Sequence, residues 1–90
     1  MSAPLTVTPC GGDLYEVEVR AATTTSHAVT VTDAARDELA PGADKEALLR
    51  ASFEFLLERE PNTAILSRFD LPLISRYFPD YPEVIRRRLG

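Results

Sequence analysis

The single cysteine and the single histidine are the residues with the greatest capacity for covalent chemistry in this chain of 90 residues. The Cys10 thiol stands beside two glycines, where it could be an exposed nucleophile with His27 as its general base. A reactive thiol needs positive neighbours that stabilise the thiolate. The nearest charges in the sequence are Asp13 and Glu16, and both are negative. We therefore expect no enzyme, with a small enzyme dependent on Cys10 and His27 as the lesser alternative.

No residue pattern predicts a metal or a cofactor. A structural zinc site needs several cysteine or histidine ligands, and one of each cannot supply them. We interpret His27 as a residue near the start of a strand, with a hydrogen-bond partner for its ring. The four glycines form no phosphate-binding loop. The carboxylates follow spacings typical of solvated helix faces, so they indicate no general acid–base pair.

Three consecutive arginines, Arg86, Arg87 and Arg88, are the candidate anion contact. Consecutive residues point in different directions around a helix, so they do not form one face. Cations in the last turn of a helix also complement its dipole, and we favour this structural role. The formal net charge is −4, whereas nucleic-acid binding needs cations gathered against phosphates. We therefore expect no nucleic-acid partner.

Large apolar side chains provide the candidates for a protein interface. Tyr77, Phe78 and Tyr81 lie close together around two prolines, a rigid arrangement that suits interface anchors. Such residues are equally good core residues, and the sequence does not decide between the two. The candidate protein-interface residues are Phe53, Leu57, Tyr77, Phe78 and Tyr81.

The N-terminal third of the chain is expected to position these residues with a small sheet. Apolar and polar residues alternate over 5–8, 14–21 and 27–32, as they do in strands with one buried face. We predict an antiparallel meander of two or three strands. Tyr15, Val17, Val19, Val29 and Val31 share its apolar face, which other elements must cover.

The remainder of the chain is predicted to be helical. Thr32 or Asp33 caps a short helix that runs through Leu39, and Asp44 caps a longer helix over 45–60. The apolar arc of the longer helix spans roughly two thirds of its circumference, far wider than the stripe of a surface helix. Its second side must be covered by the C-terminal helices, by a second copy of the chain, or by both. We therefore expect a homodimer.

Two further helices are predicted over about 70–78 and 80–89. Asp70-Leu71-Pro72 and Asp80-Tyr81-Pro82 each place an aspartate at a helix start, with proline in the first turn. A turn over 62–67 precedes them. The predicted fold class is α+β in a single domain, 1–90. A β-meander over 5–32 is followed by a helical part over 33–90, packed on one face of the sheet.

Part of the chain resembles known proteins. The segment SFEFLLEREP over 52–61, with FDL at 69–71 and YFP at 77–79, is similar to short bacterial proteins that have no assigned activity. That resemblance implies no site. The order of elements over 27–59 resembles a ribbon-helix-helix protein, which implies an intertwined, DNA-binding dimer and often an antitoxin. The strand over 26–32 lacks the Lys, Arg, Asn and Gln side chains that would contact DNA.

The most favoured function is binding of another protein, or of a second copy of the chain, without catalysis. The alternative is a DNA-binding regulator or antitoxin of the ribbon-helix-helix kind.

One cysteine excludes an internal disulfide, and no apolar run approaches the ~18 residues that cross a membrane. The first residues also lack the features of a signal peptide. We expect a cytoplasmic protein without a membrane partner.

Overall fold

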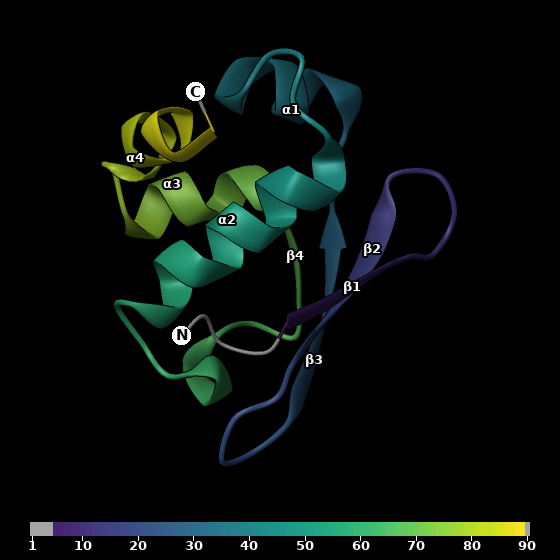
Figure 1. The fold of residues 1–90 in the computed structure, drawn as a ribbon, viewed down its shortest axis with the longest axis vertical. Coiled ribbons are helices and arrows are strands. Elements are labelled where there is room, and N and C mark those ends of the chain that lie inside the picture. The colour runs from purple at the N-terminus through teal and green to yellow at the C-terminus, as the bar shows by residue number, and fades with distance from the viewer. Residues whose placement is uncertain (1–4, 90) are drawn as a thin grey trace.

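The computed structural model describes residues 5–89 and shows an α+β fold in which a sheet and a set of helices form two layers (Figure 1). The strands are β1 (Leu5–Pro9), β2 (Leu14–Val19), β3 (Thr25–Thr30) and β4 (Arg68–Asp70). The helices are α1 (Asp33–Leu39), α2 (Lys45–Leu57), α3 (Ile74–Tyr77) and α4 (Tyr81–Leu89). Short 3-10 turns occupy Asn62–Ala64 and Leu71–Leu73.

The four strands lie in the order β1-β2-β3-β4. The first three are antiparallel, whereas β4 runs parallel to β3 and places Phe69 beside Val29. The prediction of two or three antiparallel strands was therefore wrong in number and in direction. The fourth strand has only three residues, too few for a readable alternation. It is parallel because the chain crosses over through α1 and α2 before it returns to the sheet.

The predicted alternation along the strands is confirmed. Val17, Val19, Val29 and Val31 are fully buried, while Glu16 on the opposite face is exposed. Helix α2 lies against the apolar face (Figure 1), and its Phe53 ring lies 6.2 Å from the ring of Phe69. The β-sheet and the helices therefore share one apolar core.

Both predicted helix caps at the centre of the chain are confirmed. The side chain of Thr32 accepts a hydrogen bond from Ala35 N at 3.0 Å, and that of Asp44 accepts one from Ala47 N at 3.2 Å. Each bond satisfies a backbone donor that the first helical turn leaves free. Helix α2 ends at Leu57, three residues before the predicted end at position 60.

The protein's own C-terminal part covers the second side of α2. Seven residues of this helix are buried: Leu48, Leu49, Ala51, Ser52, Phe53, Phe55 and Leu56. Helix α4 packs along the side that faces away from the sheet. The wide apolar arc is thus explained within one chain, so it no longer argues for a homodimer.

The predicted helix over 70–78 was wrong in its first half. Phe69 is buried beside Val29, so its segment extends as strand β4. Asp70 follows within that strand, and its side chain makes no capping hydrogen bond. Residues Leu71–Leu73 form a 3-10 turn, and α3 is a single turn. Helix α4 begins at Tyr81, one residue after the predicted start.

None of the helices within residues 5–89 has the length and apolarity to cross a membrane.

Candidate functional site

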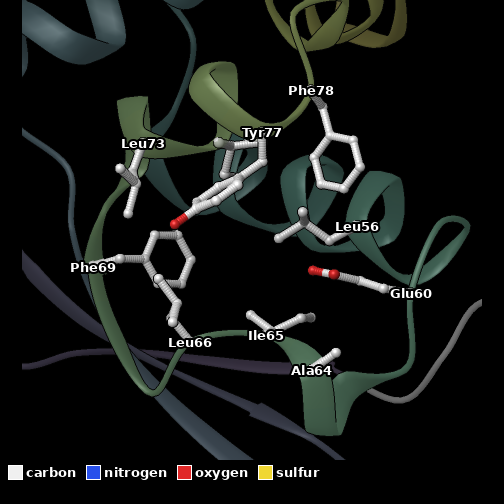
Figure 2. A pocket seen from close by; sticks show the side chains of 10 residues that line it. Leu56, Glu60, Ala64, Ile65, Leu66, Phe69, Leu73, Tyr77 and Phe78 are labelled. Carbon is white, nitrogen blue, oxygen red and sulfur yellow. The ribbon is translucent and has the colours of Figure 1, made fainter.

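A groove of about 380 Å³ lies between the end of α2, the segment around residues 64–69, and α3 (Figure 2). Most of its lining is apolar, and Glu60 is its one charged residue. The principal apolar residues are Leu56, Ile65, Leu66, Phe69, Leu73 and Phe78. A concave apolar surface with few polar groups is typical of a binding site.

Two apolar side chains of the groove are exposed to an unusual degree. Tyr77 is 64% exposed and Leu66 is 47% exposed. Within residues 5–89, Leu14 on β2 is the one other large apolar residue with comparable exposure, at 36%. Isolated exposed apolar residues are ordinary on protein surfaces, but a contiguous group in a concavity indicates a contact surface.

A polar network around the start of β3 positions the floor of the groove. The Nδ1 atom of His27 donates a hydrogen bond to the carbonyl oxygen of Leu66 at 2.7 Å, and its Nε2 atom lies 2.9 Å from Thr25 Oγ1. The Asn62 amide donates to the carbonyl oxygen of Thr23 at 2.7 Å and to Thr25 Oγ1 at 2.9 Å. These bonds attach the segment over 62–66 to the sheet. His27 therefore helps to position the groove by its hydrogen bond to the backbone of Leu66.

An arginine holds the opposite wall. The guanidinium of Arg59 lies 3.7 Å from the centre of the Phe55 ring and 5.9 Å from that of Phe78. It also forms an ion pair with Asp80 at 3.0 Å. Phe55 in turn meets Phe78 edge-on, with 5.8 Å between the ring centres. This cluster fixes Phe78 at the rim of the groove.

The Glu60 side chain is half-buried, and Figure 2 shows its carboxylate pointing into the groove. None of the described residues forms an ion pair or a side-chain hydrogen bond with this carboxylate. Arg59, its neighbour in sequence, is engaged with Phe55 and with the acidic side chains of Glu58 and Asp80. The groove thus presents one negative charge in apolar and aromatic surroundings.

The structure divides the predicted interface residues into two groups. Tyr77 and Phe78 line the groove, and Leu57 is half-buried against the core. Phe53 and Tyr81 are fully buried in the core of one chain, so neither is available to a partner in this fold. Leu66 and Glu60 were not predicted as site residues. Leu66 falls in a short segment without periodicity, and Glu60 had the appearance of a solvated helix end.

Tyr81 is a core residue with a buried hydrogen bond. Its hydroxyl lies 2.6 Å from Ser52 Oγ, which itself donates to the carbonyl oxygen of Leu48 at 2.7 Å. Because the serine proton is used in that bond, the Tyr81 hydroxyl is the donor to Ser52. Burial raises the pKa of Tyr81, and the hydrogen bond with Ser52 lowers it by a smaller amount.

The three consecutive arginines point to three different acceptors of the protein. Arg86 donates to the carbonyl oxygen of Glu38 at 2.9 Å, and Arg87 pairs with Glu83 at 2.8 Å. Arg88 pairs with Glu58. The side chains therefore spread around α4 and do not converge on one anion site, as expected for consecutive helical residues.

Cys10 and His27 do not form a catalytic pair. Cys10 is exposed in the turn after β1, and its thiol lies 3.6 Å from the carbonyl oxygen of Thr8. His27 is buried, and each of its ring nitrogens has one partner: Nε2 contacts Thr25 and Nδ1 contacts Leu66. Within residues 5–89, no three histidine, cysteine or acidic residues form a group that could hold a metal ion.

Strand β3, which resembles the DNA-contacting strand of ribbon-helix-helix proteins, is an interior strand here. Its two edges are paired with β2 and β4. Its outer face presents Ser26, Ala28 and Thr30, and none of these carries a charge. DNA binding is the alternative function, and a gel shift at low salt would test it, because phosphate attraction is strongest there.

Comparison of the chain with protein-family models, curated proteins and solved structures found no match.

Proposed function

We propose that this protein acts by binding a segment of another polypeptide in the groove, without catalysing a reaction. The observation that carries the proposal is that Leu66 and Tyr77, both exposed, line the same apolar concavity. Complete burial of a fully exposed leucine side chain contributes about 1.5–3 kcal/mol, and Leu66, which is 47% exposed, would contribute roughly half of that. Among residues 5–89, Leu14 is the one other exposed large apolar residue, so the partner's contact would centre on this groove.

A neutral peptide with two leucines, acetylated and amidated at its ends, is the probe for this proposal. We expect its addition to shift the backbone amide NMR signals of Leu66 and Tyr77 selectively. Leu66→Ser is expected to weaken the peptide about tenfold, since one apolar contact is lost. Leu14→Ser changes an exposed leucine outside the groove and is the matched control.

Two results would contradict the proposal. One is the absence of selective shifts at peptide concentrations in the millimolar range. The other is an equal loss of affinity in Leu66→Ser and Leu14→Ser, which would mean that the peptide adheres without using the groove.

Self-association is a second candidate, and the exposure of Tyr77 favours it. A two-fold interface uses the same patch on both subunits. The ring of Tyr77 lines the groove yet is 64% exposed, so it can also contact the groove of a second copy. A dimer of this kind predicts that the Leu66 and Tyr77 signals shift with protein concentration alone. Light scattering that gives a strict monomer at high concentration would contradict it.

A further inference from the structure

We infer that the groove accepts the cationic end of an aliphatic side chain, such as a lysine carried by the bound segment. The inference rests on the proposed function, because a polypeptide partner supplies the lysine. The bound side chain combines an apolar stem with a positive charge.

The Glu60 carboxylate is the first observation that supports this chemistry. It is half-buried and points into the groove, and no described residue pairs with it. A carboxylate in apolar surroundings loses part of its hydration, so a cation placed beside it gains a charge-assisted hydrogen bond. The nearest cation in sequence, Arg59, already stacks on Phe55 and pairs with Asp80.

The aromatic lining is the second observation. Phe69, Tyr77 and Phe78 all line the groove, and Figure 2 shows Phe69 and Tyr77 across it from Glu60. The face of an aromatic ring attracts a cation that lies within about 6 Å of its centre. A carboxylate together with several rings therefore favours an ammonium over a neutral or anionic group.

The apolar residues between these groups favour a stem of several methylene groups. Leu56, Ile65 and Leu66 line the groove together with Glu60. A lysine side chain buries its four-carbon stem along apolar surface while its ammonium reaches a polar group. A small hydrophilic cation would leave these residues uncovered, so we expect it to bind more weakly.

Three small probes with the same six-carbon tail test the charge preference. Hexylammonium, hexanol and hexanoate are titrated separately at constant ionic strength, and binding is followed by NMR shifts of Leu66 and Tyr77. We expect hexylammonium to bind about fivefold more tightly than hexanol, from the ion pair and the aromatic rings together. Hexanoate is expected to bind more weakly than hexanol.

The variant Glu60→Gln isolates the role of the carboxylate. It is expected to fold normally, since no described residue bonds to this side chain, and the same NMR spectrum verifies the fold. In this variant the preference for hexylammonium over hexanol should fall to the part that the aromatic rings contribute. Glu16→Gln removes the same charge from the exposed face of β2 and should retain the full preference.

A peptide pair identifies the source of the cation. The two-leucine peptide is compared with a version in which a lysine stands between the leucines. The lysine version should bind to the wild type about fivefold more tightly than it binds to Glu60→Gln. Equal affinities of hexylammonium and hexanol would overturn the inference and leave the proposed function standing. Binding of hexylammonium without binding of either peptide would overturn the proposed polypeptide partner. No shift with any probe would overturn both.

Discussion

The two sides of the α2 C-terminal half differ in how completely the protein covers them. Toward α4, Ser52 and Phe55 are fully buried, and the hydroxyl of Tyr81 reaches Ser52. Toward α3, Leu56 and the following Glu60 face a groove with exposed aromatic and apolar side chains. Because packed contacts provide most of a domain's stability, we expect the α4 side to stabilise the fold and the α3 side to bind.

The largest expected difference between the two sides comes from removal of one ring on each. Phe55→Ala removes a buried ring that contacts Arg59, Phe78 and Tyr81, and it should lower the free energy of unfolding by about 3–5 kcal/mol. Tyr77→Ala removes an exposed ring and should cost less than about 1 kcal/mol. Urea denaturation followed by circular dichroism measures both values.

A loss of this size approaches the total stability of a small domain, so Phe55→Ala could fail to fold. Phe55→Leu keeps most of the apolar volume, should remain folded, and should still be less stable than Tyr77→Ala. Equal destabilisation by changes at Phe55 and Tyr77 would remove the distinction between the two sides of α2.

An intermediate effect is expected from Asn62, which connects the floor of the groove to the sheet. Asn62→Ala removes the donor to the carbonyl oxygen of Thr23 and should destabilise the protein by about 1–3 kcal/mol. Amide hydrogen exchange of Ile65 and Leu66 should also become faster, because their segment loses an attachment. Thr63→Ala, at the exposed neighbouring position, is the control. Unchanged exchange in Asn62→Ala would show that the groove forms without this network.

Most elements of the fold could be predicted because their signals are local. Alternation along 14–19 defines a half-buried strand, and the caps at Thr32 and Asp44 need only a few consecutive residues. Strand β4 could not be predicted, because three residues become a strand only when Phe69 pairs with Val29, 40 positions earlier in the chain. The same dependence on distant contacts explains why the helix expected from position 70 is shorter.

The groove was predictable only in part for a related reason. Tyr77 and Phe78 have a composition typical of a contact surface, which the sequence alone reveals. Whether an aromatic residue belongs to the core or to the surface depends on the packing of α4 against α2, and Tyr81 became a core residue in that packing. Glu60 and Leu66 acquire their significance from the segment over 62–66, which is positioned by His27 and Asn62.

The smallest expected effect is the dependence of stability on pH that the buried Tyr81 hydroxyl produces. Burial raises the pKa of Tyr81 above the value of about 10 that it has in the unfolded chain. Below pH 10 the residue is protonated in both states, so its contribution to stability is constant. Above pH 10 unfolding releases the proton of Tyr81, and the folded state loses up to ~1.4 kcal/mol of stability per pH unit.

Removal of the Tyr81 hydroxyl should remove this dependence on pH. Tyr81→Phe is expected to lose about 0.5–1.5 kcal/mol at pH 7 with the Ser52 hydrogen bond, yet its stability should fall less steeply between pH 10 and 11. Tyr77→Phe, which removes a hydroxyl from a largely exposed ring, is the matched control. Urea denaturation at pH 7, 10 and 11 gives the three slopes, and the other titrating groups are common to all the proteins compared. Equal slopes in the wild type and Tyr81→Phe would mean that the Tyr81 hydroxyl ionises as readily in the folded state as in the unfolded one, and that the α4 side of α2 is not closed to water.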